Sequence, residues 1–342
     1  MRAYQVTQFG IDQLQTAELP VPQVSAGTAL IRVHAVSLNY RDFMVVKGMY
    51  NPRMALPRIP CSDGAGEVVA VGEGVTRVQP GDRVCGIFMP NWIDGVATSK
   101  KNGSALGGDV DGMLTEYALL QAESVVRFPQ HLSYDEAATL PCAAVTAWNA
   151  LHHAGDPPSP AHAGDTVVIQ GTGGVSLFAL QFARLLGMRV LGTSSSDEKL
   201  ERARTLGLDA GLNYRQTPEW AKWVIAMTDG VGADRIIEVG GAGTFGQSLQ
   251  ATRVGGLVAQ IGVLSGRATT EPLPLTPILH KQLRVQGIYV GSRAMFEQMN
   301  EAIAGAQLHP VVDRVFAFDQ AQAAFHHMES AAHFGKIVIR IV

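Results

Sequence analysis

A glycine-rich turn between a strand-like and a helix-like segment is the part of this sequence with the clearest chemistry. The β-branched run Thr166–Gln170 predicts a buried strand, and apolar residues at helical spacing predict a helix over Val175–Leu186. Between them, Gly171 permits a tight turn, and Gly173 leaves room for backbone to approach a pyrophosphate. The first N–H groups of a helix attract anions. The pattern predicts a dinucleotide site made of Gly171, Thr172, Gly173, Gly174 and Val175.

The residues after the next strand favour one nicotinamide nucleotide over the other. An NAD site usually has a carboxylate about 20 residues after the first glycine, where it binds the ribose 2′-hydroxyl. That place holds Ser194 and Ser195 here, followed by Lys199, and Tyr214 after a further strand is placed to stack on adenine. Hydroxyls and a cation suit a 2′-phosphate, which a carboxylate would repel. The sequence favours NADPH as the cofactor, with NADH as the alternative.

Length and composition bound the rest of the interpretation. The 342 residues suffice for two domains, and the net charge of −3 comes from 27 basic and 30 acidic residues in which neither sign clusters. We therefore expect neither nucleic acid nor a membrane as a partner. The three cysteines form an odd, well-separated set that is typical of a reducing compartment. The start of the chain has no signal-peptide pattern, so we expect a cytoplasmic protein.

Two kinds of segment must position the candidate residues. As far as about residue 121, turns separate short strands expected at Ala29–Val36, Glu67–Val71, Arg83–Phe88 and Leu114–Leu120. The polar, glycine-rich stretch 89–112 is expected to form a surface lobe. Ser133 and Glu136 have the spacing of a capping box and predict a helix start. These features predict an irregular antiparallel β domain.

From residue 166 onward, strands and helices alternate. Further strands are expected at Arg189–Thr193, Ala210–Leu212, Arg235–Val239, Leu257–Ile261 and Leu283–Val290, with helices near Asp197–Leu206, Trp220–Met227, Thr244–Arg253 and Ala294–Ala304. This order predicts an α/β fold with a doubly wound parallel sheet. Strand character returns at Val311–Phe318 and Lys336–Val342, which we expect to rejoin the first domain. The domains are therefore expected at 1–143 with 292–342, and at 144–291.

The order of short motifs resembles the medium-chain dehydrogenase/reductase superfamily along essentially the whole chain. The motifs are Asn39-Tyr40-Arg41-Asp42, Gly64-Ala65-Gly66-Glu67-Val68-Val69, Val71-Gly72, Pro80-Gly81-Asp82-Arg83-Val84, Gly171–Ser176 and Gly335-Lys336-Ile337-Val338. The resemblance implies a GroES-like antiparallel β domain that carries catalytic residues, together with a Rossmann dinucleotide-binding domain. It also implies that the active site lies in the cleft between the two domains.

The resemblance also bears on metal content. Zinc-dependent members hold catalytic zinc with a Cys at the position of Asn39, a His-Glu pair at Ser62-Asp63, and a later Cys or Asp, which Cys142 matches. Because Asn and Ser are poor zinc ligands, we expect no zinc. A site improvised from Cys61, Asp63 and Cys142 stays open as an alternative. The chain is similar to the zinc-free branch of quinone oxidoreductases and enoyl reductases, and to a bacterial subgroup labelled alcohol dehydrogenase.

The resemblance assigns roles to particular residues. Asn39 and Tyr40 are expected to border the nicotinamide with Ser62, Asp42 to organise its loop, and Gly291-Ser292-Arg293 to contact the cofactor. Substrate is expected to enter between Tyr50, Trp92 and the 89–112 stretch, near Cys142. Asp63 is either a general base for alcohol oxidation or a loop-ordering carboxylate beside Arg41 or Arg58. Tyr40 is the first candidate to donate a proton to the oxygen of the substrate.

Three functions remain open at this point. The first is an NADPH-linked, zinc-independent reductase of quinones or α,β-unsaturated carbonyl compounds. The second is an alcohol or aldehyde dehydrogenase of the same superfamily, and the third is an NADPH-binding protein with a structural or regulatory role. The resemblance further suggests a homodimer formed through a strand edge near Leu283–Val290.

Overall fold

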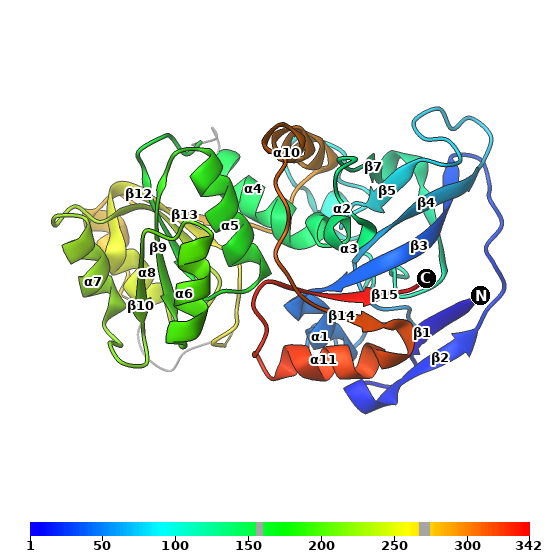
Figure 1. The fold of residues 1–342 in the computed structure, drawn as a ribbon, viewed down its shortest axis with the longest axis horizontal. Coiled ribbons are helices and arrows are strands. Elements are labelled where there is room, and N and C mark those ends of the chain that lie inside the picture. The colour runs from blue at the N-terminus through cyan, green and yellow to red at the C-terminus, as the bar shows by residue number, and fades with distance from the viewer. Residues whose placement is uncertain (155–159, 267–273) are drawn as a thin grey trace. The chain divides into compact units, whose positions relative to one another are not determined.

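A computed structural model of the chain describes residues 1–154, 160–266 and 274–342 (Figure 1). It divides into two compact units, which are unit 1 (Met1–Val145 with Gly291–Val342) and unit 2 (Thr146–Val290). The boundaries expected from the sequence differ from these by one or two residues. Unit 1 is discontinuous because the chain leaves it for unit 2 and then returns.

Unit 1 is built on a mixed, mainly antiparallel sheet. In the described part of the chain its strand order is β14-β15-β3-β4-β5-β7, with β6 also paired to β3. The bounds are β3 (Thr28–Leu38), β4 (Asp63–Val71), β5 (Arg83–Gly86), β6 (Tyr117–Gln121), β7 (Val125–Arg127), β14 (Val312–Ala317) and β15 (Lys336–Arg340). A separate hairpin pairs β1 (Arg2–Val6) with β2 (Leu14–Glu18). The expected return of the tail to the first domain is confirmed, since β15 pairs with β3.

The helical segments of unit 1 are short, apart from two near its C-terminus. They are α1 (Tyr40–Val46), α2 (Ser99–Asn102), α3 (Tyr134–Ala137), α10 (Arg293–Ala306) and α11 (Ala321–Glu329), with a π-helix at Leu140–Ala144 and 3-10 turns at Ile11–Gln13, Ala122–Ser124 and Phe318–Gln320. The predicted capping box is present, because Ser133 Oγ accepts from Glu136 N while the Glu136 carboxylate accepts from Ser133 N. Of these, α3 and α11 lie against β14 and β15, and α10 lies against β7.

Strand β4 starts four residues before its expected first residue, Glu67. The glycines of Gly64-Ala65-Gly66 suggest a turn in the sequence, yet they pair with β3. A Cβ at Gly66 would lie 2.2 Å from the Arg32 carbonyl oxygen, so glycine is required for this close approach. The longer strand places Asp63 opposite Ser37, beside the end of β3.

The 89–112 stretch is at the surface only in part, since residues 94–100 and 109–111 are exposed while both of its flanks are anchored. It contains α2, but Trp92, Ala105 and Leu106 are buried. The Arg41 guanidinium donates to the Leu106 carbonyl at 2.6 Å and ties this stretch to α1. The prediction of a surface lobe thus holds for the middle of the segment and misses the few apolar residues that anchor it.

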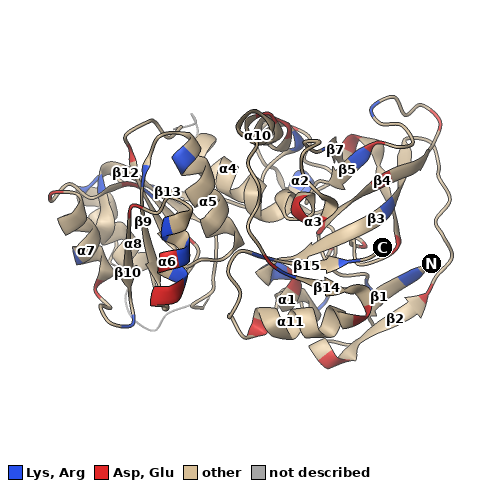
Figure 2. Ribbon diagram, viewed as in Figure 1, with Lys and Arg blue, Asp and Glu red and all other residues tan. Residues whose placement is uncertain are grey.

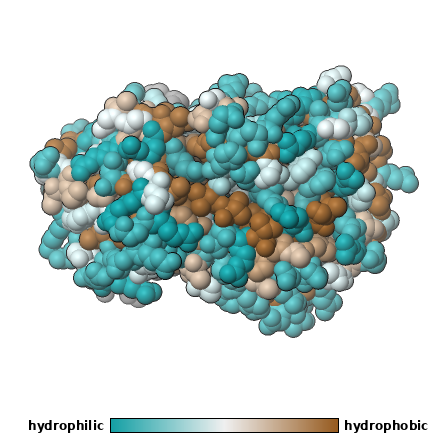
Figure 3. All heavy atoms as spheres, viewed as in Figure 1, coloured by the Kyte–Doolittle hydropathy of each residue, from teal (hydrophilic) through white to brown (hydrophobic). Residues whose placement is uncertain are grey.

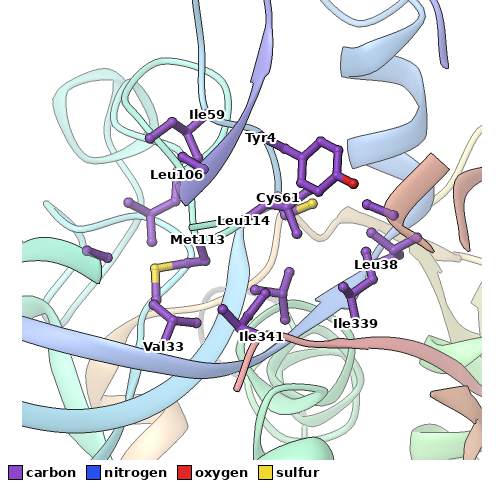
Figure 4. Close-up of a cluster of buried hydrophobic side chains, with 14 of the residues drawn as sticks. Tyr4, Val33, Leu38, Ile59, Cys61, Leu106, Met113, Leu114, Ile339 and Ile341 are labelled. Carbon is purple, nitrogen blue, oxygen red and sulfur yellow. The ribbon is translucent and has the colours of Figure 1, made fainter. Parts of the chain in front are cut away.

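The hydrophobic core of unit 1 contains the residues that immediately precede the candidate residues in the chain. In Figure 4 the side chains of Leu38, Cys61 and Ile339 point into one hydrophobic cluster, together with Met113 and Tyr4. Leu38 immediately precedes Asn39 in the chain, and Cys61 immediately precedes Ser62. Burial of these neighbours therefore fixes where the two polar segments begin.

Unit 2 contains the predicted parallel sheet, with strand order β10-β9-β8-β11-β12-β13 in the described residues. The strands are β8 (Thr166–Gln170), β9 (Arg189–Ser194), β10 (Ala210–Asn213), β11 (Ala233–Glu238), β12 (Thr252–Gln260) and β13 (Arg284–Gly287). The helices are α4 (Val145–His152, whose first residue belongs to unit 1), α5 (Gly174–Leu185), α6 (Asp197–Thr205), α7 (Trp220–Met227), α8 (Phe245–Ala251) and α9 (Thr276–His280). Helices cover both faces of the sheet (Figure 1).

The order of the strands locates a binding crevice in unit 2. The chain runs outward from β8 through β9 to β10, and then crosses to β11 on the other side of β8. Ligands of open α/β sheets bind at the carboxyl ends of the strands where the order reverses. The glycine turn after β8 lies at this reversal.

Charged residues of both signs are interspersed along both units, as the composition predicts (Figure 2). Hydrophilic residues cover most of the face shown in Figure 3. Within residues 1–154, 160–266 and 274–342, no helix has the length and apolar character needed to cross a membrane.

Candidate active site

The glycine turn of unit 2 has the geometry of a phosphate-binding loop. Gly171 has φ +69°, a left-handed conformation that favours glycine, and Gly173 is the N-cap of the twelve-residue helix α5. A Cβ added at either glycine would meet no atom within 4 Å, so the space above the loop is open. Ser176, in the place of a third glycine, is buried and donates to the Gln170 carbonyl at 2.6 Å. The loop therefore fits the pyrophosphate of a dinucleotide.

Residues expected to select the nucleotide lie at the same edge of the sheet. Ser195 follows β9 and Tyr214 follows β10, and these two strands are parallel neighbours. Lys199 lies in the first turn of α6, whose N-cap Ser196 accepts from its backbone N–H. Ser194 is buried and accepts from the Ser196 backbone N–H at 3.2 Å. This edge thus presents hydroxyls and a cation.

Asp197, the acidic residue nearest to this edge in sequence, has its own partners. Asn213 Nδ2 donates to Asp197 Oδ1 at 3.0 Å, and Gln216 Nε2 donates to Asp197 Oδ2 at 2.8 Å. The carboxylate therefore links α6 to the segment after β10. Asp197 is the negative charge that would most disfavour a 2′-phosphate here, and these two hydrogen bonds give its carboxylate a structural role.

A buried carboxylate at the end of β11 was missed by the sequence analysis. Glu238 is fully buried, and its two oxygens accept from five donors, which are Gly240 N, Gly241 N, Thr244 Oγ1, Gln170 Nε2 and Ser248 Oγ. The available signal was a glutamate directly after two apolar β-branched residues, Ile236 and Ile237, and before Val239. Glu238 fixes the loop after β11 to the end of β8.

In unit 1, Asn39 and Asp42 form the start of α1. The Asn39 backbone N–H donates to Asp42 Oδ2 at 2.9 Å in a capping box. Asp42 Oδ1 also accepts from the Ser62 backbone N–H and from the Arg41 guanidinium, each at 3.2 Å. Asp42 is fully buried. It therefore holds together the two segments that carry Asn39 and Ser62.

The structure brings four of the predicted residues into one hydrogen-bonded cluster. Asn39 Nδ2 donates to Ser62 Oγ at 3.4 Å, and Ser62 Oγ donates to Asp63 Oδ1 at 2.7 Å. The Cys142 backbone N–H donates to Asp63 Oδ2 at 3.0 Å. Ser62 and Asp63 are fully buried, while Cys142 is half-buried.

Lys336 completes this cluster, although the sequence analysis gave it no role beyond a family motif. Its side chain is buried, and Nζ donates to the Leu38 carbonyl at 2.6 Å and to Asn39 Oδ1 at 2.5 Å. The expectation that Asp63 lies beside Arg41 or Arg58 was wrong. Arg41 pairs with Asp42 and Arg58 pairs with Asp111, whereas Lys336 is the cation whose charge acts on Asp63.

Burial dominates the electrostatics of this cluster. It raises the pKa of Asp63 to about 6, against the lowering effects of Lys336, Ser62 and Asn39, while the nearby Asp42 carboxylate raises it further. Burial, and next the charge of Asp63, also raises the pKa of the Cys142 thiol well above its usual value. Cys142 is therefore a neutral thiol, and Asp63 changes charge near neutral pH.

Replacing Asp63 with asparagine is expected to remove a pH dependence of stability. Because the folded pKa of about 6 lies above the ordinary 3.8, Asp63 stabilises the fold below about pH 4. This contribution is lost as the pH rises through 6, and it amounts to about 3 kcal/mol at about 1.4 kcal/mol per unit of pKa. Urea unfolding of both proteins from pH 4 to 7 measures it. Parallel curves for wild type and D63N would contradict the assignment.

The three aromatic residues assigned to the reaction occupy different environments. Tyr40 on α1 is 36% exposed, so its hydroxyl is accessible. Tyr50 is half-buried, with the Arg41 guanidinium 5.3 Å from its ring centroid. Trp92 is buried, and its indole N–H donates to the Gly95 carbonyl at 2.8 Å. Trp92 therefore has a clear packing role, and Tyr40 is the most exposed of the three.

The segment Gly291-Ser292-Arg293 begins helix α10. Ser292 is its N-cap and accepts from the Met295 backbone N–H at 3.2 Å. The Arg293 guanidinium donates to the Glu123 carbonyl at 2.8 Å and forms an ion pair with the Glu123 carboxylate. Through these contacts with Glu123, Arg293 anchors the start of helix α10. A cofactor contact of this segment stays a prediction.

The cluster of unit 1 does not fit a catalytic zinc ion. Zinc takes thiolate, imidazole or carboxylate ligands, usually three from the protein in catalytic sites. At the ligand positions of the zinc-dependent members stand Asn39, whose Oδ1 accepts from an ammonium, and Ser62, whose Oγ donates to Asp63. Among the described residues, no group of three or more His, Cys, Asp or Glu side chains is arranged to hold a metal. No step of the reaction is therefore assigned to zinc.

Comparisons with known proteins agree with the two units. The family "Alcohol dehydrogenase GroES-like domain" matches residues 25–130, and the family "Zinc-binding dehydrogenase" matches residues 174–305. A zinc-type alcohol dehydrogenase-like protein of Schizosaccharomyces pombe is 45% identical over 335 residues, which are 97% of this chain and 96% of that protein.

Solved structures extend this similarity to the fold. A candidate alcohol dehydrogenase from Sinorhizobium meliloti is 41% identical, with a TM-score of 0.89 over 99% of this chain and 98% of that one. A mycobacterial quinone oxidoreductase is 26% identical, with a TM-score of 0.81 over 100% of both chains. The structure of a mycobacterial protein complexed with NADPH is also 26% identical, with a TM-score of 0.83 over 100% of both chains. On this similarity in sequence, domain order and fold, the chain belongs to the medium-chain dehydrogenase/reductase superfamily and is an oxidoreductase.

Proposed function

We propose that the chain is a zinc-independent, NADPH-linked reductase of quinones or α,β-unsaturated carbonyl compounds. The observation that carries this proposal is the Lys336-Asn39-Ser62-Asp63 cluster, which holds hydrogen-bond donors where zinc-dependent members have metal ligands. Such a site lacks a Lewis acid of its own, so its substrate must accept a hydride with the help of hydrogen bonds alone. Conjugated carbonyls and quinones meet this condition more easily than simple ketones.

The residues of each unit have separate tasks in this reaction. The reduced nicotinamide supplies the hydride when bound, and the loop from Gly171 to Val175 holds its pyrophosphate. Negative charge then develops on the substrate oxygen, where Asn39 Nδ2 and the Tyr40 hydroxyl are the proposed donors. Asp42 maintains the position of Asn39 through the capping box of α1.

Assays with both substrate classes test the proposal. We expect the purified protein to oxidise NADPH in the presence of 1,4-benzoquinone or 2-cyclohexen-1-one, with less than one zinc ion in ten chains by elemental analysis. A stoichiometric metal, or turnover with primary alcohols and NADP⁺ alone, would point to the second function. Tight NADPH binding without turnover of any of these compounds would indicate the third.

One observation favours alcohol oxidation as the second candidate. An alcohol dehydrogenase without a metal needs a general base whose pKa is near the working pH. Burial raises the pKa of Asp63 to about 6, and Ser62 Oγ already donates to it. A relay from an alcohol through Ser62 to Asp63 would meet this need, and loss of alcohol turnover in D63N would test it.

The preference for NADPH rests on Ser195 and Lys199. Replacing Ser195 with aspartate puts a carboxylate at the end of β9, where it would bind the 2′-hydroxyl of NADH and repel a 2′-phosphate. We expect the ratio of NADPH to NADH affinity to fall at least tenfold, or about 1.4 kcal/mol. Fluorescence titration of both nucleotides measures it, with Ser330→Asp on exposed unit 1 surface as the control. An unchanged ratio would place the 2′-phosphate elsewhere.

We also propose that two copies pair through the edge strand β13. In the described residues this strand ends the sheet of unit 2. Val285, Tyr289 and Leu279 in and beside it are 41%, 39% and 75% exposed, respectively. An open strand edge with apolar side chains is suited to pairing across a two-fold axis. Sedimentation at micromolar concentration is expected to give a dimer, and a monomer would refute the pairing.

A further inference from the structure

We propose that Lys336 is a positioning residue of the active site, and that its ammonium is an internal cation which orients the Asn39 carboxamide toward Ser62 and substrate. This inference rests on the proposed function for its catalytic consequence. Its structural part concerns unit 1 alone and can be tested without substrate.

The fold places Lys336 beside Asn39 with little freedom. Lys336 is the first residue of β15, and the pairing of Ile337 with Leu38 brings it against the end of β3. Gly335 before it has φ +92°, and a Cβ there would lie 2.4 Å from the Val311 carbonyl oxygen. The side chain of Lys336 is 4% exposed. The pairing of β15 with β3 and the glycine required at position 335 therefore determine where the Lys336 side chain enters the cluster.

An ammonium has donors only, so it determines which side of the Asn39 amide carries the oxygen. Asn39 Oδ1 accepts from Lys336 Nζ at 2.5 Å, and the NH₂ group must then face the other way. There Nδ2 donates to Ser62 Oγ at 3.4 Å. The Asn39 side chain also hydrogen-bonds to Asp63, so the amide presents its donors to the Ser62-Asp63 pair, and one of them would have to turn to a substrate oxygen. Without the ammonium, the amide could rotate and present its oxygen instead.

Lys336 also balances the buried negative charge of the cluster. The charges that act on Asp63 are Lys336 from β15 and Asp42 from α1, and the charge of Asp63 in turn raises the pKa values of the Cys61, Cys85 and Cys142 thiols. Arg41, the other buried cation, is paired with Asp42. Lys336 is therefore the positive charge that opposes protonation of Asp63.

The test compares Lys336→Met, which keeps length and loses charge, with Lys336→Arg, which keeps the charge. Lys222→Met on the exposed face of α7 is the matched control, since its side chain is 76% exposed. Carbon-detected NMR of aspartate carboxyl groups follows Asp63 in each protein. In K336M we expect the Asp63 titration to move upward by at least one pH unit, with the Asn39 side-chain NH₂ resonances shifted. K222M should leave both unchanged, and K336R should leave the Asp63 midpoint within half a unit.

Kinetics separate positioning from general damage. In K336M we expect kcat for quinone or enone reduction to fall 10- to 100-fold, while the Kd for NADPH stays within threefold. An Asp63 midpoint and a kcat equal to wild type would overturn the inference. If wild type shows no reductase activity but the NMR shifts occur, the proposed function fails and the positioning of Asn39 stands. Should K336M not fold, Lys336→Gln removes the charge and keeps a polar side chain, and it must reproduce the upward shift of the Asp63 midpoint and the loss of kcat, or the inference is wrong.

Discussion

Replacing Gly173 with aspartate is expected to abolish measurable NADPH binding while the melting temperature is unchanged or slightly higher. Gly173 is the N-cap of α5 with an extended backbone (φ −79°), and a Cβ there meets no atom within 4 Å. Aspartate is a favoured N-cap, worth about 1 kcal/mol over residues that cannot cap. The same carboxylate would lie in the space for the pyrophosphate, where like charges about 4 Å apart cost about 4 kcal/mol.

Calorimetric titration with NADPH and a thermal melt measure the two effects of Gly173→Asp. We expect an affinity loss of about 1000-fold, the equivalent of about 4 kcal/mol. Gly305→Asp on α10 is the matched control, because a Cβ at Gly305 also meets no atom within 4 Å. An affinity within threefold of wild type in G173D would show that the cofactor binds elsewhere.

Replacing Glu238 with glutamine is expected to destabilise the protein by about 3 kcal/mol. In either orientation of the new amide, its NH₂ group would face N–H donors and could not form hydrogen bonds with them. On one side are Gly240 N and Gly241 N, and on the other is Gln170 Nε2. Gln170 cannot turn over to help, because its oxygen accepts from the backbone N–H groups of Val239 and Gly240.

Thermal unfolding measures the effect of Glu238→Gln. At about 2.1 cal/mol/K of unfolding entropy per residue, about 3 kcal/mol corresponds to a decrease of about 4 °C in the melting temperature of this 342-residue chain. Glu198→Gln is the control, since Glu198 is an exposed residue in the first turn of α6. Equal melting temperatures for the two variants would contradict the described network.

Local patterns in the sequence predict most of the elements of unit 2. Strand β8 and helix α7 have the predicted bounds, because each is a strongly patterned run between turn residues. Strand β13 is shorter than predicted, since the chain turns at Val290, which has φ +58°. Helix α8 stops two residues early because Thr252 is already extended and starts β12. Neither the turn at Val290 nor the start of β12 at Thr252 is reported by hydrophobic periodicity.

The candidate site is predicted only in part, because its contacts join distant parts of the chain. Asn39, Ser62 and Asp63 are found through motifs, and the structure brings them together. The role of Lys336 could not be predicted, since its partner Asn39 lies 297 positions away. Asp63 was therefore given the wrong cations as neighbours. Glu238 was missed because a strand-end glutamate has no motif, although its apolar surroundings were a visible sign.

The discontinuity of unit 1 has a consequence for biosynthesis. A ribosome adds about 5–20 residues per second, so the 297 positions between Asn39 and Lys336 take about 15–60 seconds to translate. During this interval the nascent chain lacks the ammonium that acts on Asp63, and the side of β3 that β15 will cover has no partner. Exposed backbone of this kind recruits other strands. Only after the codons of β14 and β15 have been translated can the sheet of unit 1 be completed and the contact between Lys336 and Asn39 form.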